Sequence, residues 1–274
     1  MAAKKEWLLE SELALKSVST SAEIIEERWY EGLGHRTKGS WRDLVTELDI
    51  DIEKKIKEIL GEIDYKIIGE ESTKGRKLDI DSQKPVWFVD PIDGTTNLVS
   101  SIPFYSTSVG LSVNSVFPVG AVAVPALKEI FFTLGDKGSF MNSRSLKVAS
   151  ADLKNSLISV GFSGDGQNND KRKQEYDFFG MLNDKSRGCL RLGSAAVNAC
   201  YVACGRLQAT YAISNKIWDI AGGLAIAQAA DCKVYIQWSA ESPDISYVIG
   251  APGVAEAIVD FIHSKKLAKL KPIA

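Results

Sequence analysis

Hydrophobic positions at helical spacing open the chain and then give way to strand-like runs. Residues 5–30 place leucine, isoleucine and valine three and four positions apart, which predicts a long amphipathic helix. Residues 46–49 (TELD) have the form of a capping box, and isoleucines at helical spacing follow, so a second helix is expected there. Residues 67–71 (IIGEE) predict a short strand that ends in two glutamates. The charged residues 72–84 are expected to form an exposed loop.

A fully apolar run is the clearest feature of the pattern. Residues 86–89 (VWFV) follow a proline and lead into the turn DPIDGTTN at residues 90–97, which is typical of a buried strand. Further strand-like runs, separated by turn residues, predict an antiparallel meander. These runs lie at residues 107–113, 118–124, 129–134, 135–141 and 146–150.

Strands alternate with helices in the second half of the chain, which predicts an α/β arrangement. The expected strands are residues 156–162, 207–213, 233–237 and 245–249, and the expected helices are residues 176–183, 195–205, 220–230 and 254–263. Two of these helices are rich in alanine and glycine, which allows close helix packing. A soft boundary near residue 150 divides an N-terminal half, 1–150, from a C-terminal half, 151–274, and we expect both to form one compact unit.

Composition is that of a soluble globular protein. The 274 residues are 45% apolar and 25% charged, with a net charge of −2, so nothing indicates a nucleic-acid surface. The N-terminal stretch has charges among its apolar residues, and we expect neither a signal peptide nor a membrane helix. Four cysteines without C-x-x-C spacing are expected to be free thiols in a reducing cytoplasm. The only histidines, His35 and His263, stand in no recognisable motif, which disfavours a Ser-His-Asp triad and excludes a histidine-rich zinc site.

Carboxylates gather where the apolar run ends. Asp90 and Asp93 flank a stiff Pro-Ile pair and precede Gly94, so two carboxylates and a carbonyl are available to a hard cation. Backbone N–H groups beside them suit a phosphate oxygen. The alternative is an ordinary turn in which the aspartates only form the turn. In the same way, Asp49 and Asp219 could be no more than helix caps.

Six segments, taken in order, carry a more specific signal. They are residues 43–49 (DLVTELD), 69–72 (GEES), 90–97 (DPIDGTTN), 138–142 (GSFMN), 191–198 (RLGSAAVN) and 218–222 (WDIAG). Together they resemble the inositol monophosphatase family of Mg²⁺-dependent, Li⁺-sensitive phosphatases, which are kin to fructose-1,6-bisphosphatase. The match covers nearly the whole chain. It implies an α/β (α+β) fold arranged as a five-layer αβαβα sandwich of the sugar-phosphatase type.

The resemblance also implies roles for individual residues. The implied ligands of about two to three Mg²⁺ ions are Glu70, Asp90, Asp93, Asp219 and the carbonyl of Ile92. Thr95, hydrogen-bonded to Asp49, would orient or deprotonate the attacking water, and Glu71 would help to position it. The implied substrate-binding residues are Gly94, Thr95, Arg191, Gly193, Ser194, Ala195, Asn215 and Lys216.

The activity implied by the resemblance is hydrolysis of a phosphate monoester to an alcohol and inorganic phosphate, without a phosphoenzyme. The substrate stays open, because Ala212 stands where inositol monophosphatases carry a glutamate that binds an inositol hydroxyl. Fructose 1,6-bisphosphate, histidinol phosphate, 3′-phosphoadenosine 5′-phosphate and NADP are alternatives, as is a catalytically silent relative that binds a phosphorylated metabolite. We further expect a cytoplasmic homodimer whose partners include neither nucleic acid nor membrane.

Overall fold

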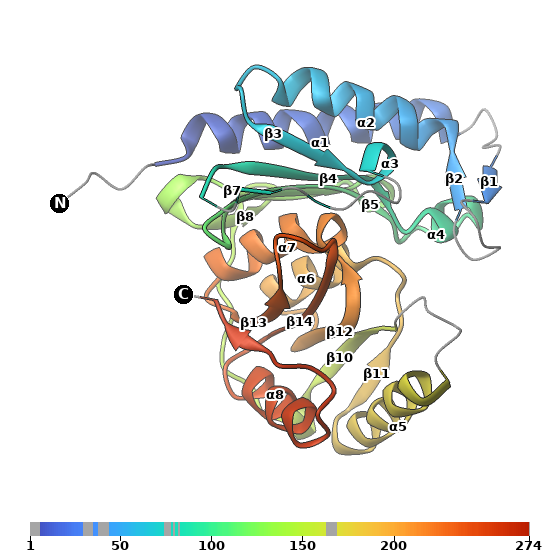
Figure 1. Ribbon diagram of the computed structural model, residues 1–274, viewed down its shortest axis with the longest axis vertical. Coiled ribbons are helices and arrows are strands. Elements are labelled where there is room, and N and C mark those ends of the chain that lie inside the picture. The colour runs from blue at the N-terminus through green and yellow to red at the C-terminus, as the bar shows by residue number, and fades with distance from the viewer. Residues whose placement is uncertain are drawn as a thin grey trace.

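The structure is a computed structural model that describes residues 6–29, 35–37, 44–73, 78, 80–81, 83–162 and 169–273. Its helices and two large sheets lie in five layers (Figure 1). In order, the layers are α1 (Leu8–Trp29) with α2 (Glu47–Leu60), a seven-stranded sheet, α6 (Ala195–Ala203) with α7 (Ile217–Ala229), a six-stranded sheet, and α5 (Asn169–Lys185) with α8 (Val254–Ser264). This arrangement confirms the expected αβαβα sandwich.

The seven-stranded sheet has the order β3-β4-β5-β6-β7-β8-β9, with β3 parallel to β4 and the other pairs antiparallel. Its strands are β3 (Lys66–Gly69), β4 (Val86–Asp93), β5 (Ser106–Val113), β6 (Val116–Val124), β7 (Glu129–Thr133), β8 (Ser139–Met141) and β9 (Arg144–Ser145). Trp87 and Val89 of β4 pack in the apolar cluster of α1 and α2, whereas Val86 and Phe88 join the cluster of α6 and α7. Helices cover both faces, so β4 is buried throughout and appears in sequence as one continuous apolar run.

The six-stranded sheet has the order β11-β10-β12-β14-β13-β15. Its strands are β10 (Leu157–Gly161), β11 (Gly188–Leu190), β12 (Ala209–Lys216), β13 (Lys233–Trp238), β14 (Asp244–Gly250) and β15 (Lys271–Pro272). Strand β10 is parallel to β11 and β12, and the remaining pairs are antiparallel. The predicted alternation of strands and helices is present, and the sheet that it builds is mixed.

Helix α7 lies very close to the seven-stranded sheet, although it belongs to the second half of the chain. A Cβ added at Gly110 of β5 would overlap the backbone of Ala221 and Gly222, and one added at Gly120 of β6 would overlap the carbonyl of Gly222. These glycines therefore let the α7 backbone rest directly on β5 and β6. The contact brings the first turn of α7 toward the carboxyl end of β4 (Figure 1).

Smaller elements complete the described part of the chain. Strands β1 (His35–Thr37) and β2 (Leu44–Thr46) form an antiparallel pair, and α3 (Glu70–Thr73) and α4 (Thr95–Val99) are short helices. Single-turn 3₁₀ helices lie at Pro125–Leu127, Gly135–Lys137 and Leu153–Asn155. All four cysteines are free thiols, as expected. Within the described ranges, no helix is both long and apolar enough to cross a membrane.

Two boundary predictions were wrong for local reasons. Helix α5 begins at Asn169 rather than at residue 176, because its polar first turns carry no hydrophobic periodicity. The strand predicted through residue 71 ends at Gly69, and the chain turns there into the short helix α3.

Two further predictions failed around loops. The strand expected at residues 146–150 does not form, and the short β9 just before it pairs with β8 instead. There the Val148 N–H donates to the carbonyl of Ala230 at 2.8 Å, which ties this segment to the end of α7. Leu78 lies in the stretch expected to be exposed, yet it is buried in the core beside α6 and α7.

Candidate active site

The end of β4 forms a tight turn that carries two aspartates. The pairing of β4 with β5 is irregular between Asp90 and Asp93, and the Ile92 N–H donates to Asp90 Oδ1 at 3.0 Å. Gly94 follows with a φ of 95° and begins helix α4. A Cβ at Gly94 would lie 3.1 Å from the carbonyl oxygen of Gly193, so glycine is needed for both conformation and space.

Three carboxylates from three elements meet beside this turn. Ligand atoms of Glu70, Asp90 and Asp219 all lie within 4.8 Å of one another. Glu70 is the first residue of α3 and directly follows β3, the parallel neighbour of β4. Asp219 lies in the first turn of α7. The close packing of α7 on the first sheet therefore joins residues far apart in the sequence into one acidic cluster.

The electrostatics of this cluster are unfavourable for three negative charges. Burial, followed by the charges of Glu70, Asp93 and Asp219, raises the pKa of Asp90 well above its usual value. Burial, followed by the charges of Asp93 and Glu70, likewise raises the pKa of Asp219, although the nearby charge of Lys216 opposes the shift. A bound cation would therefore stabilise the ionised form of these carboxylates by offsetting their mutual repulsion.

Asp93 connects this cluster to helix α6. Its Oδ2 accepts hydrogen bonds from the Ser194 hydroxyl and from the Ala196 N–H, both at 2.7 Å. Burial raises the pKa of Asp93 to about 7, and these two hydrogen bonds limit the rise. The second carboxylate oxygen accepts neither of these bonds. Asp93 is therefore held from one side by the start of α6 and acts electrostatically on Asp90 and Asp219 from the other.

The predicted contact between Thr95 and Asp49 is present. Thr95 Oγ1 lies 3.3 Å from Asp49 Oδ1 and 3.0 Å from the carbonyl oxygen of Ile92. Asp49 is completely buried in the first turn of α2. Asp49 was expected to be either a helix cap or a partner of Thr95. Its position fits both, because it lies in the first turn of α2 and also contacts the Thr95 hydroxyl.

The residues expected to line a substrate pocket fall into two groups. Gly193, Ser194 and Ala195 form the turn into α6, next to Gly94. Asn97 holds this turn, because its Nδ2 donates to the carbonyl oxygen of Leu192 at 2.8 Å. No local sequence pattern predicts this contact of Asn97, since its partner lies far away along the chain.

The second group is engaged in contacts of its own. The Lys216 ammonium lies 2.7 Å from Asp244 Oδ1, and the Arg191 guanidinium lies 5.9 Å from the centre of the Phe162 ring. Asn215 follows an irregularity in the β12–β14 pairing. Lys216 also contacts the acidic cluster, because its backbone N–H hydrogen-bonds to Asp219 and its charge opposes the rise in the pKa of that carboxylate.

Ala212 is buried directly opposite Tyr247 in the β12–β14 pair. Tyr247 is buried as well; burial raises its pKa, and the charges of Asp93 and Asp219 add to the rise. A tyrosine side chain therefore lies beside Ala212, the position where the resemblance leads us to expect a glutamate.

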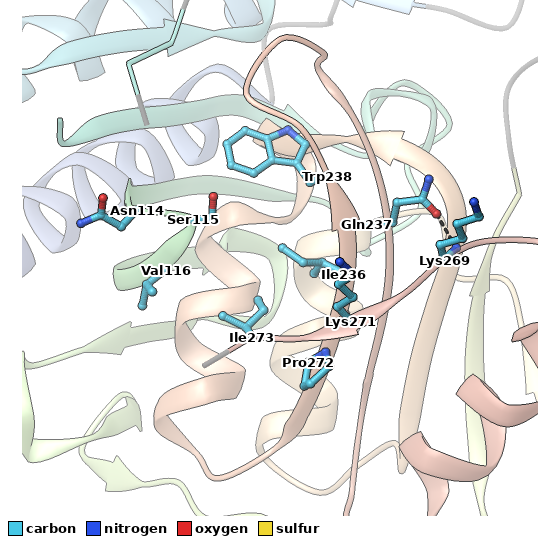
Figure 2. Close-up of a pocket in the computed structure, with 10 residues that line it drawn as sticks. All are labelled: Asn114, Ser115, Val116, Ile236, Gln237, Trp238, Lys269, Lys271, Pro272 and Ile273. Atoms are coloured by element: carbon cyan, nitrogen blue, oxygen red, sulfur yellow. Dashed lines mark hydrogen bonds between the residues drawn. The ribbon is translucent and has the colours of Figure 1, made fainter. Parts of the chain in front are cut away.

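Among the cavities in the described part of the chain, two lie outside the cluster of acids. One of about 490 Å³ is bounded by Asn114, Trp238 and Lys271, between the β5–β6 turn and the C-terminal strands, and no candidate site residue lines it (Figure 2). The other, of about 580 Å³, lies between α2 and α3 and is lined in part by Glu53 and Glu71. The second cavity therefore adjoins the short helix that carries Glu70.

The donor set of the acidic cluster fits a hard divalent cation. The three grouped side chains offer only carboxylate oxygens, and the described group contains neither cysteine nor histidine. Oxygen ligands favour Mg²⁺ or Ca²⁺ over the softer transition metals. The raised pKa of Asp90, caused by burial and neighbouring charge, is also the property expected of a buried carboxylate that a cation neutralises.

Comparisons with known proteins point to one family. A model of the inositol monophosphatase family matches residues 9–262. Inositol monophosphatase 3 of Solanum lycopersicum is 36% identical over 226 residues, which cover 80% of this chain and 82% of that protein. The solved structure of Mycobacterium tuberculosis SuhB has a TM-score of 0.79 at 26% identity, over 97% of this chain and 100% of that chain. An IMPase/NADP phosphatase solved with Mg²⁺ and phosphate has a TM-score of 0.76 at 21% identity, over 90% of this chain and 92% of that chain.

Proposed function

Because the chain belongs to the inositol monophosphatase family, we propose that it hydrolyses phosphate monoesters with Mg²⁺ bound among Glu70, Asp90 and Asp219. The observation that carries this proposal is the convergence of these carboxylates, whose ligand atoms lie within 4.8 Å of one another. Asp93 and the carbonyl of Ile92 complete the proposed ligand set. About two to three ions would be held, as in other phosphatases that use clustered metals.

The proposed mechanism assigns the chemistry of the water to Thr95 and Asp49. When bound, Mg²⁺ supplies positive charge that makes a water more acidic and offsets the charge of the phosphate. The Thr95 hydroxyl donates to Asp49, which leaves its lone pairs to accept a hydrogen bond from the attacking water. As the water attacks phosphorus, its proton passes to Thr95 while the Thr95 proton passes to Asp49. The ester P–O bond breaks, and the alcohol leaves with a proton from solvent.

Other residues would position the water and the phosphate. The N–H groups of Gly94 and Thr95 are proposed to donate to phosphate oxygens, which stabilises charge in the transition state. Glu71, the neighbour of Glu70 in α3, is proposed to help to position the water or the metal.

The alcohol end of the substrate is proposed to lie against the turn at Gly193, Ser194 and Ala195, which Asn97 holds beside Gly94. Arg191, Asn215 and Lys216 would contact its polar groups. Inositol monophosphate is the first candidate substrate, because relatives such as that of Solanum lycopersicum are named inositol monophosphatases. Ala212 offers no side-chain acceptor for a hydroxyl, so a sugar phosphate, histidinol phosphate or a phosphonucleotide is the alternative.

The proposal is tested by measuring phosphate release with and without Mg²⁺. The panel holds inositol 1-phosphate, fructose 1,6-bisphosphate, histidinol phosphate, 3′-phosphoadenosine 5′-phosphate and NADP. We expect Mg²⁺-dependent turnover of at least one ester, and the preferred one identifies the alcohol that the pocket accepts. Lack of turnover across the panel, together with tight binding of a phosphorylated metabolite, would instead favour the silent relative.

Assembly, location and lithium sensitivity are separate parts of the proposal. We propose a homodimer in the cytoplasm that Li⁺ inhibits, on the strength of the family alone. Light scattering at micromolar concentration would show twice the 29.9 kDa chain mass for a dimer. An unchanged rate of phosphate release across millimolar Li⁺ would contradict the lithium proposal.

A further inference from the structure

Glu53 is a buried carboxylate on α2 whose hydrogen bonds serve another element. The residue is only 4% exposed. Its Oε2 accepts the Glu71 N–H at 2.7 Å, and its Oε1 accepts the Ser72 N–H at 3.1 Å. The Lys57 ammonium lies 2.7 Å from the same Oε1 and balances the charge. One side chain therefore holds two consecutive amides of α3, and we call these contacts the Glu53 clamp.

The helix held by this clamp has little stability of its own. Helix α3 spans only Glu70–Thr73, and the first amides of any helix lack intrahelical acceptors. A single helical turn also lacks cooperative support from further turns. The clamp supplies the acceptors from a different part of the chain, as an N-cap side chain would do locally.

Gly69 makes the clamp possible. A Cβ at Gly69 would overlap the carboxylate group of Glu53. Glycine therefore lets the carboxylate approach the backbone on one side of Glu70, while Glu71 and Ser72 are bound on the other side. The backbone that carries Glu70 is restrained at both of its neighbours.

Glu70 needs such restraint because Asp90 and Asp219 repel it when all three carboxylates are ionised, the state that binds a cation. Its ligand oxygen lies within 4.8 Å of ligand oxygens of Asp90 and Asp219, and like charges at this distance disfavour one another. If the single helical turn α3 were free to move, it would carry Glu70 away from Asp90 and Asp219 and so relieve this repulsion. A carboxylate held in place before the cation binds loses less free energy on binding than one that must be ordered.

We propose that Glu53 is a positioning residue that holds Glu70 at the metal site through the backbone of α3. The inference rests on the proposed function, since it takes Glu70 to be a metal ligand. Glu53 itself touches neither metal nor substrate in this account. Removing the Glu53 carboxylate should weaken Mg²⁺ binding. The loss of binding free energy should be larger than any loss in the free energy of unfolding measured without Mg²⁺.

The test compares Mg²⁺ affinity, measured by titration calorimetry, among four variants of the full chain. Glu53→Ala should weaken binding by about 10- to 100-fold, the usual effect of losing a group that orients a metal ligand. Glu53→Gln keeps the size and one acceptor, so its loss should be smaller. Glu58→Ala is the matched control, because Glu58 pairs with a lysine on the same helix and lines the same cavity. It should bind as the wild type does. Glu70→Gln removes the ligand itself.

A second readout reports on the clamp directly. In Glu53→Ala the amide hydrogens of Glu71 and Ser72 should exchange about tenfold faster or more, because each loses its acceptor. The adjoining cavity lets water replace the lost carboxylate, so we expect the variant to fold. If Glu53→Ala does not fold, Mg²⁺ affinity and amide exchange are compared between Glu53→Gln and the wild type instead.

The outcomes separate this inference from the function on which it rests. Wild-type Mg²⁺ affinity in Glu53→Ala, with weakened binding in Glu70→Gln, would overturn the positioning role alone. A lower melting temperature in EDTA with unchanged affinity would mean a merely structural role and would overturn it too. Wild-type affinity in Glu70→Gln would overturn the proposed metal site and this inference with it.

Discussion

At the scale of single residues, the pair of Thr95 and Asp49 carries the proposed proton transfer. The hydroxyl oxygen lies 3.3 Å from a carboxylate oxygen that is fully buried, so solvent does not compete for that acceptor. The carbonyl oxygen of Ile92, 3.0 Å away, is a second acceptor for the single hydroxyl proton. Because that proton is directed toward these acceptors, the lone pairs of Thr95 remain for a water, which is what orientation of a water requires.

Thr95→Ala should lower kcat by about 10²- to 10⁴-fold, because it removes the positioned proton acceptor. The Mg²⁺ requirement should change little, since no metal-binding carboxylate is altered. Thr95→Ser restores a hydroxyl and is the matched control, with most of the rate retained. Steady-state phosphate release decides the matter, and a Thr95→Ala protein that turns over as fast as Thr95→Ser would contradict the assignment.

Asp93 makes stability depend on pH. Its pKa is raised from 3.8 to about 7, mainly by burial, so the folded state binds the proton more tightly than the unfolded state does. This stabilisation is complete below the unfolded value and is lost as pH rises through the folded value. In EDTA, the free energy of unfolding from urea titrations should therefore fall as the pH rises from 3.8 to about 7.

Two comparisons test the origin of that pH dependence. Asp93→Asn cannot ionise at this position, so its stability in EDTA should fall less steeply over the same pH range. Saturating Mg²⁺ should oppose the fall, because a cation binds the deprotonated carboxylates. A wild-type slope in Asp93→Asn would show that other groups cause the dependence.

The sequence could predict the acids of the site but not the residues that hold them. Asp90, Asp93 and Asp219 stand in dense local motifs, and the structure brings Asp90 and Asp219 together, with Asp93 near enough for its charge to raise the pKa of Asp90. Glu53 and Asn97 act on backbone groups that are distant in sequence, so no local pattern shows these contacts, although Asn97 ends the motif at residues 90–97. Hydrogen bonds to main-chain atoms leave little trace in residue type, which is why only coordinates reveal them.

At the scale of elements, the start of α6 links helix capping to the site. The Ser194 hydroxyl accepts the Val197 N–H at 3.3 Å as the N-cap of α6, and it donates to Asp93 Oδ2 at 2.7 Å. The Ala196 N–H donates to the same oxygen. A single side chain therefore ends the turn, begins the helix and fixes the direction of Asp93.

Ser194→Ala should destabilise the protein by about 1 kcal/mol through loss of the cap. It should also raise the Mg²⁺ concentration needed for half-maximal activity, because Asp93 loses its hydrogen bond from the Ser194 hydroxyl. Ser156→Ala removes another buried serine hydroxyl, one that donates to the carbonyl of Asp152, and is the control for a stability effect alone. Equal Mg²⁺ requirements in the two variants would contradict the link between cap and site.

Elements with a strong hydrophobic period were predictable, and those set by polar contacts were not. The buried strand β4 and the helix α2 follow from their apolar positions. The short α3 has no such pattern and forms where the Glu53 carboxylate accepts hydrogen bonds from its amides. The first turns of α5 are polar as well, so the pattern placed its start too late. Tertiary contacts decide the structure where local preference is weak.

At the scale of the whole molecule, α7 joins the two halves of the chain. It packs on β5 and β6 of the first sheet and also contacts strands of the second sheet. Asp219 reaches the acidic cluster only because of this packing. We therefore propose that residues 1–150 and 151–274 unfold as one cooperative unit.

Gly120→Ala should destabilise the whole protein by about 3 kcal/mol, because its Cβ would meet the α7 backbone at Gly222. Gly180→Ala is the matched control, since a Cβ there has nothing within 4 Å on helix α5. It should stabilise the protein by about 0.5–1 kcal/mol, owing to better helix propensity. Urea unfolding followed by tryptophan fluorescence and by circular dichroism should give coincident curves. Two separate transitions would contradict the single unit.

The sequence motifs identified the family, but the spatial relation between the two halves came from the packing of glycines. Gly110 and Gly120 lie in ordinary strand patterns, and nothing local shows that a helix from the other half rests on them. Close backbone approach depends on the partner as well as on the glycine, so it becomes visible only in three dimensions.

The most direct test of the central claim is the rate of phosphate release from inositol 1-phosphate as a function of Mg²⁺, for wild type and Asp219→Asn. Asp136→Asn, on an exposed acid away from the cluster, is the control. We predict that wild type and control release phosphate only with Mg²⁺, and that Asp219→Asn loses at least about 10³-fold of that rate, since charge stabilisation is the main catalytic term. Wild-type turnover that is independent of Mg²⁺, or undiminished turnover in Asp219→Asn, would contradict the account.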